Sequence, residues 1–207
     1  MSTTTRPAHR AKAAILNLPN QLTGLRLILA VVMFATIAWE RYLASLLLFA
    51  VAAGTDWLDG YFARKYNQVT TLGRILDPFA DKVIICGTFI FLLDVPAMTH
   101  LPWGLRAWMV VIVVGRELLV TALRSFIEER GSDFSAQMSG KLKMVFQCLA
   151  AGMALFFLHY VGSQPAAAEI APAWLYAVLI GSIWAAVLLT VYSGIGYLFA
   201  AVRLLKQ

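Results

Sequence analysis

Residues 56 to 81 read DWLDGYFARKYNQVTTLGRILDPFAD and hold four of the eleven acidic residues of the chain: Asp56, Asp59, Asp77 and Asp81. The first two are three positions apart and the last two are four apart, so each pair would share one face of a helix. Long apolar stretches flank this segment on both sides. We therefore expect two helices joined through the Gly73 region, with the two pairs of carboxylates facing each other.

The composition around this segment indicates a membrane protein. The chain has 207 residues, of which 60% are hydrophobic and only 14% charged, well below the roughly 25% usual in soluble domains. Its mean hydropathy is +0.74. The stretches 145–168 and 173–202 contain no Asp, Glu, Lys or Arg, and each exceeds the roughly 20 residues that a helix needs to cross the hydrocarbon core.

The pattern of apolar stretches and loop residues predicts an all-α fold, an integral membrane bundle of six transmembrane helices. We expect the whole chain, 1–207, to form one membrane domain that begins with a short cytoplasmic, amphipathic segment over residues 1–19. Loop signals such as Pro96, Pro102 and Pro172 separate the spans. The six helices are expected near residues 21–40, 42–66, 75–95, 103–129, 137–161 and 171–203.

The positions of the basic residues predict an orientation. Arg41 and Arg106 fall on one side of the expected bundle, whereas the other fifteen Lys and Arg residues fall on or towards the opposite side. Because cytoplasmic flanks accumulate positive charge, both termini and the aspartates should face the cytoplasm from the inner membrane. The orientation in the membrane thus accounts for the net charge of +6, which does not indicate nucleic acid as a partner.

Four carboxylates close together would repel one another, so a bound cation or protonation is required. Ligation by oxygen alone, without His or Cys, favours Mg²⁺ or Mn²⁺. Two such ions that share carboxylates are a common arrangement for an in-line displacement at phosphorus. The alternative is an internal network of ion pairs with Arg64, Arg74 and Lys82, which the matched spacing of the four aspartates disfavours.

Small and basic residues between the two aspartate pairs suit a nucleotide diphosphate. Gly60 and Ala63 lie on the same helical stripe as Asp56 and Asp59, and leave room for a ligand beside the backbone. Arg64 adds a planar cation that can pair with phosphate oxygens.

Together these residues resemble the signature of the CDP-alcohol phosphotransferases, Asp56-x2-Asp59-Gly60-x2-Ala63-Arg64-x8-Gly73-x3-Asp77-x3-Asp81. Eight residue types over 26 positions keep every spacing. The resemblance implies a six-helix membrane fold, usually a homodimer surrounded by membrane lipids. It also implies transfer of a phosphatidyl or similar group from a CDP-linked lipid to an alcohol, with release of CMP.

The resemblance further implies roles for single residues. Asp56, Asp59 and Asp77 would hold two metal ions, and Asp81 would both contribute to the second metal and act as general base on the attacking hydroxyl. A base beside a metal-bound alcohol needs little tuning of its own pKa. The residues expected to bind the CDP-lipid are Asn20, Thr23, Gly60, Ala63, Arg64, Thr70 and Gly73.

Three further motifs resemble those of bacterial phosphatidylglycerophosphate synthases: Asn20-Gln21-Leu22-Thr23-x2-Arg26, Gly115-Arg116-Glu117 with Leu123-Arg124, and Gly140-Lys141-Leu142-Lys143. Met144 departs from the Thr that commonly follows the second Lys. This likeness implies CDP-diacylglycerol as donor and glycerol 3-phosphate as acceptor.

A physical argument supports a charged acceptor. Arg116, Arg124, Lys141 and Lys143 fall near the expected cytoplasmic ends of two helices, where they could form a cationic pocket for a phosphate. For the two lysines, the alternative is attraction to anionic lipids. Arg116 and the adjacent Glu117 should have different partners, and the alternative for Glu117 is a structural role that orients an arginine.

Other functions fit parts of the pattern. A related enzyme of the same family could use inositol phosphate or serine as acceptor. Intramembrane prenyltransferases also bind a diphosphate through aspartates and Mg²⁺, but their two motifs lie in separate halves of a longer bundle. A cation transporter would usually place its ion site near the membrane midplane between repeats, and no repeat is visible here.

Overall fold

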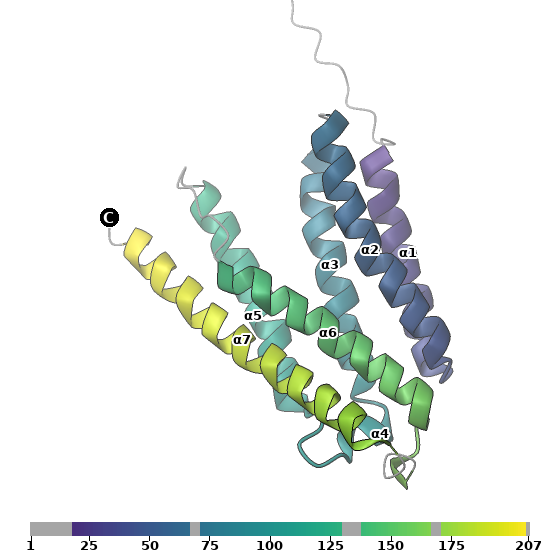
Figure 1. Ribbon diagram of the computed structural model, residues 1–207. Coiled ribbons are helices and arrows are strands. Elements are labelled where there is room, and N and C mark those ends of the chain that lie inside the picture. The colour runs from purple at the N-terminus through teal and green to yellow at the C-terminus, as the bar shows by residue number, and fades with distance from the viewer. Residues whose placement is uncertain (1–17, 67–70, 130–137, 167–170, 206–207) are drawn as a thin grey trace, which may run out of the picture.

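The computed structural model describes residues 18–66, 71–129, 138–166 and 171–205, and in these ranges the chain forms helices and no strand. Six of the helices are long and one is a single turn, and Figure 1 shows their arrangement. In chain order they are α1 (Leu18–Ala38), α2 (Tyr42–Tyr66), α3 (Thr71–Leu92), α4 (Pro96–Thr99), α5 (Ala107–Glu129), α6 (Met138–Val161) and α7 (Ala173–Leu205).

The long helices form two groups. In the first group α1 packs against α2 and α3, and in the second α7 packs against α5 and α6. Contacts of α6 with α2 and α3, and of α5 with α3, join the two groups. Figure 1 shows the groups close together at the end that carries α4 and diverging towards the other end, where α1 begins and α7 ends.

The six long helices match the six expected from the sequence, with boundaries shifted by a few residues. The largest shifts, of four residues, are at the start of α5 and at the start of α3, which begins at Thr71 and therefore includes Gly73 in its first turn. Pro78 consequently lies inside the helix. The single turn α4 falls in the expected loop before α5. Of the expected N-terminal segment 1–19, residues 1–17 lie outside the described residues.

A tight turn joins α1 to α2 and explains why these helices are antiparallel neighbours. Glu40 adopts a left-handed conformation (φ 57°) directly after α1. Its N–H bonds to the carbonyl of Ile37 at 2.9 Å, and the N–H of Arg41 bonds to the carbonyl of Thr36 at 2.8 Å. These two bonds form a Schellman motif, which satisfies helix-end carbonyls and reverses the chain.

The two basic residues that the sequence analysis set apart from the others, Arg41 and Arg106, lie in loops between helices. Arg41 lies in the turn between α1 and α2, and Arg106 directly precedes α5. Both connections are at the α4 end of the bundle (Figure 1).

The core and the surface are both apolar. One buried cluster draws on all six long helices, with Met33, Phe49, Phe89, Met109 and Leu155 among its members. Large apolar side chains are also exposed along every long helix: Ile28, Val31, Leu47, Ile90, Val111, Leu118, Val145, Leu188 and Phe199 are examples. Extensive apolar exposure is typical of a surface that contacts lipid or another protein.

Two helical segments are long and apolar enough to cross a membrane, Gly140–Val161 and Ala173–Arg203. Shorter apolar helical segments run over Thr23–Ala38 and Tyr42–Thr55. The helical architecture is thus consistent with a membrane protein, and the number of six spans stays a prediction.

Candidate active site

Asp81 on α3 is held by an arginine from α1. Nη1 of Arg26 donates a hydrogen bond to Oδ1 of Asp81 at 2.7 Å. Arg26 is almost fully buried, with 1% of its side chain exposed, whereas 28% of the Asp81 side chain is exposed. Burying a guanidinium is costly unless it is paired, so this contact explains how α1 tolerates a charge in an apolar stretch.

The other three aspartates of the signature lie on helical backbone. Asp56 and Asp59 are in the second half of α2, and Asp77 is in α3 one turn before Asp81. Helices α2 and α3 are in contact. The side chains of these three aspartates lie outside the described residues, so their expected metal contacts stay predictions.

The same holds for most of the residues expected to bind the CDP-lipid. Thr70 lies outside the described residues. Asn20, Gly60, Ala63, Arg64 and Gly73 have helical backbones, but their surroundings are not described. Thr23 on α1 is described and is fully buried, one turn before Arg26.

Asp81 opens onto a cavity that also holds cationic residues. This cavity has a volume of about 320 Å³, and α3, α5 and α6 line it through Pro78, Asp81, Lys82, Ile85, Glu117, Arg124, Lys143, Met144 and Gln147. A second cavity of about 450 Å³ shares six of these residues and extends towards α7. Its further lining residues are Arg116, Val120, Thr121, Ser125, Gly140, Lys141 and Tyr197.

The four cations expected to bind an acceptor phosphate therefore come together. Arg116 and Arg124 on α5 and Lys141 and Lys143 on α6 all line the larger cavity, and Lys82 on α3 joins them. Among the residues that line the two cavities, only Asp81 and Glu117 carry negative charge. The site is thus strongly cationic, and a carboxylate lies at its edge.

Glu117 links two of these cations. Its Oε1 accepts a hydrogen bond from Nζ of Lys143 and lies 3.3 Å from Nη1 of Arg116. Glu117 and Lys143 are both buried. The expectation that Arg116 and Glu117 have different partners is therefore only half right: each has its closest hydrogen bond elsewhere, but the two also contact each other.

Helix α7 supplies the closest partner of Arg116. Nη2 of Arg116 donates a hydrogen bond to Oγ of Ser193 at 2.6 Å, and its guanidinium lies over the ring of Tyr197, 5.2 Å from the centroid. Ser193 and Tyr197 are both buried and lie one turn apart on α7. The aromatic ring and the hydroxyl together fix the position of the guanidinium.

Both arginines of the cavity keep a buried donor without a partner. The Nε atoms of Arg116 and Arg124 are buried and make no hydrogen bond to any residue in the described part of the chain. An unmade hydrogen bond of a buried donor costs about 1–3 kcal/mol.

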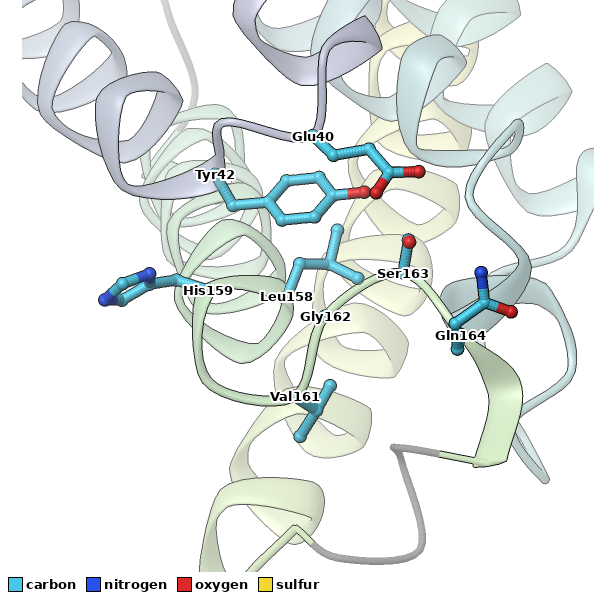
Figure 2. A pocket seen from close by; sticks show the side chains of 8 residues that line it. All are labelled: Glu40, Tyr42, Leu158, His159, Val161, Gly162, Ser163 and Gln164. Atoms are coloured by element: carbon cyan, nitrogen blue, oxygen red, sulfur yellow. The ribbon is translucent and has the colours of Figure 1, made fainter.

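Another cavity lies at the opposite end of the bundle, near the turn between α1 and α2. Its volume is about 370 Å³, and Glu40, Tyr42, Leu158, His159, Val161, Gly162, Ser163 and Gln164 line it. In Figure 2 the hydroxyl of Tyr42 lies beside the carboxylate of Glu40. Among the described residues that line this cavity, none was expected to bind metal, CDP-lipid or phosphate.

Sequence reasoning missed several residues of the cationic site. Arg26 was predicted only as the last residue of a motif near the start of the chain, with no partner assigned, and Lys82 was considered only as an ion-pair partner of the aspartates. Ser193 and Tyr197 lie in an uncharged stretch of 30 residues where small polar and aromatic residues usually pack between helices. A charge inside an apolar helix was the available signal for Arg26.

Comparisons with known proteins identify the family of the chain. The family model for CDP-alcohol phosphatidyltransferases matches residues 16–192.

Curated relatives cover most of the chain. A protein of Bacillus subtilis named CDP-diacylglycerol–glycerol-3-phosphate 3-phosphatidyltransferase is 34% identical over 196 residues, which are 87% of this chain and 93% of the relative. A protein of Escherichia coli with the same name is 33% identical over 169 residues, 70% of this chain and 87% of the relative. A probable phosphatidylglycerophosphate synthase of Mycobacterium tuberculosis is 35% identical over 198 residues, 93% of this chain and 85% of the relative.

Proposed function

The chain belongs to the CDP-alcohol phosphatidyltransferase family, and on this basis we propose that it transfers the phosphatidyl group of CDP-diacylglycerol to glycerol 3-phosphate. The products are phosphatidylglycerophosphate and CMP. In this reaction the acceptor hydroxyl forms a P–O bond to the phosphorus that carries diacylglycerol. The P–O bond to CMP breaks, and the hydroxyl proton leaves to a base.

The observation that supports this acceptor is the shared cavity. Asp81, the expected base, and Lys82, Arg124 and Lys143 line one cavity, which continues into the larger one. A small alcohol that carries a phosphate dianion could bind these cations and present its hydroxyl to Asp81 at the same time. A neutral acceptor such as serine would leave the cations uncompensated.

In the proposed mechanism Asp81 accepts the proton of the acceptor hydroxyl. The hydrogen bond from Arg26 holds one oxygen of the carboxylate in place, so that the carboxylate is oriented before the acceptor binds. The phosphate of the acceptor pairs with Arg116, Arg124, Lys141 and Lys143, which fixes the distance of its hydroxyl from the base.

The donor set fits a hard divalent ion. Asp56, Asp59, Asp77 and Asp81 offer carboxylate oxygens from two helices in contact, and these are the ligands that Mg²⁺ and Mn²⁺ prefer. We propose that these four residues hold two such ions. When bound, the ions would neutralise charge on the diphosphate. Asn20, Thr23, Gly60, Ala63, Arg64, Thr70 and Gly73 are the proposed contacts of the CDP-lipid.

The proposed location is the inner membrane, with six spans and with the active site and both termini facing the cytoplasm. The exposed apolar side chains on every long helix support contact with lipid. The separation of Arg41 and Arg106 from the remaining cations supports the orientation. A homodimer is part of the same proposal, by resemblance to the family.

The decisive experiment follows CMP release by the protein purified in detergent with Mg²⁺ or Mn²⁺ and CDP-diacylglycerol. We expect release that depends on glycerol 3-phosphate, stops when EDTA removes the metal, and is lost in Asp81→Asn. CMP release with inositol phosphate or serine, and not with glycerol 3-phosphate, would agree with the family but refute glycerol 3-phosphate as the acceptor. Full activity of Asp81→Asn would refute the assignment of Asp81 as the general base.

A further inference from the structure

Helix α7 lies outside the aspartate signature, yet it contacts the cationic cavity at one well-defined place. Ser193, Gly194 and Tyr197, which we call the Arg116 platform, surround the side chain of Arg116 on α5. We propose that the Arg116 platform positions Arg116 for the phosphate of the acceptor, and thereby sets the affinity for the acceptor. This inference rests on the proposed function, because it concerns the same cationic cavity.

Each member of the platform makes a different contact. The hydroxyl of Ser193 accepts a hydrogen bond from Nη2 of Arg116 at 2.6 Å, and the ring of Tyr197 lies 5.2 Å from Cζ of the guanidinium. Gly194 leaves the space for the aliphatic part of the same side chain, because a methyl group there would lie 3.2 Å from Cγ of Arg116. The hydroxyl, the ring and the missing side chain together fix the arginine along its whole length.

Helix α6 contributes to the position of the platform. A methyl group at Gly140 would lie 3.1 Å from the hydroxyl oxygen of Tyr197, so the glycine lets Tyr197 reach the cavity wall. Gly140 opens the motif that ends with Lys143, which is itself a cation of the cavity. A larger residue at Gly140 would therefore press on Tyr197, which explains the glycine in this motif in a way that the sequence does not reveal.

Arg116 lines the larger cavity in spite of these contacts. Nη2 bonds to Ser193 and Nη1 lies near Glu117, whereas Nε has no hydrogen-bond partner among the described residues. The Arg124 Nε is in the same situation, and both arginines line the same cavity. A phosphate accepts several N–H donors at once, so it suits a cavity that two guanidinium groups line.

A positioning role makes a specific kinetic prediction. Arg116 would pair with the phosphate in the ground state and in the transition state alike, so a displaced Arg116 should raise KM for glycerol 3-phosphate with little change in kcat. KM for CDP-diacylglycerol should not change. A merely structural role would lower the amount of active enzyme instead, and would leave both KM values unchanged.

The variants are Ser193→Ala, Gly194→Ala and Tyr197→Leu, with Tyr197→Phe as the conservative change that keeps the ring. We expect KM for glycerol 3-phosphate to rise about tenfold in Tyr197→Leu. In Tyr197→Phe this KM should stay near that of the unchanged protein, because the ring face supplies the attraction.

Matched controls on the same helix are Ser182→Ala, Gly181→Ala and Tyr192→Leu. Ser182 is buried and bonds to its own helix, Gly181 has open space beside it, and Tyr192 is exposed.

A second measurement separates this inference from the proposed function. Inorganic phosphate is titrated into the purified metal-loaded protein, and the thermal midpoint is followed. We expect phosphate to raise the midpoint of the unchanged protein and of Tyr197→Phe. Ser193→Ala, Gly194→Ala and Tyr197→Leu should each need about tenfold more phosphate for the same rise. Such a result without CMP release would uphold the platform and refute the proposed function. Equal phosphate dependence in all variants, or a KM for glycerol 3-phosphate that does not move, would overturn the platform.

Discussion

Arg26 and Asp81 lie 55 positions apart in the chain, and Nη1 of the first donates to Oδ1 of the second at 2.7 Å. The contact joins α1 to α3 and ties the expected base to a buried cation. Because the guanidinium is almost completely buried, its position is fixed by the surrounding helices. The structure thus gives α1 a part in orienting the carboxylate that we propose as base.

Arg26→Ala should lower kcat about tenfold or more, because a hydrogen bond to a charged group contributes about 1.5–3 kcal/mol. Arg26→Lys keeps the charge and should recover part of the loss. CMP release at saturating substrates measures both. The exposed Arg41→Ala, at the other end of the bundle, is the control. A kcat unchanged in Arg26→Ala would exclude a role for this contact in the reaction.

The sequence predicted the place of Asp81 but not its partner. Apolar stretches and loop residues were enough to predict the long helices, because each helix depends mainly on local pattern. The pairing of Arg26 with Asp81 depends on how α1 and α3 cross, which no local pattern contains. The same limit applies to Ser193 and Tyr197, whose residue types are common between apolar helices.

Glu117 should be important for stability, because it is the described carboxylate in contact with both Arg116 and the buried Lys143. Glu117→Gln would leave these two cations without a negative partner, and breaking a buried ion pair costs about 3–5 kcal/mol. For a chain of this length we expect a thermal midpoint roughly 6–20 °C lower. Thermal unfolding in detergent measures it.

The control for this change is Glu40→Gln, which removes an exposed carboxylate at the far end of the bundle. Inorganic phosphate should restore part of the midpoint of Glu117→Gln, since it supplies negative charge to the same cations. An unchanged midpoint in Glu117→Gln would show that Lys143 and Arg116 do not need this carboxylate.

Gly87 on α3 is required by the close approach of α1. A methyl group at this position would lie 2.2 Å from Cζ of Phe34, and two further ring atoms would be closer than 3.0 Å. The ring of Phe34 cannot easily move away, because it stacks on Phe91 with centroids 4.9 Å apart. Gly87→Ala should therefore destabilise the protein by about 1–3 kcal/mol.

Thermal unfolding again checks the prediction for Gly87, with Gly181→Ala as the matched change in a helix with open space. That control should be neutral or slightly stabilising, by about 0.5–1 kcal/mol, since alanine favours a helix over glycine. Equal midpoints for the two variants would mean that α1 and α3 are not packed as closely as the structure has them.

The orientation in the membrane can be tested at two exposed arginines from opposite ends of the bundle. Arg41 follows α1, and Arg203 lies in the last turn of α7. The chain has only two cysteines, Cys86 and Cys148, so replacing both by Ser gives a background for single-cysteine variants. We expect Arg41→Cys in intact spheroplasts to react with a membrane-impermeant maleimide, because few positive charges accompany it. Arg203→Cys should react only after the membrane is opened, since it lies with the majority of the cations.

The reverse labelling pattern would place the cationic cavity outside the cell, where the proposed CDP-linked donor could not reach it. Labelling of both cysteines from outside would contradict the division of the chain into spans.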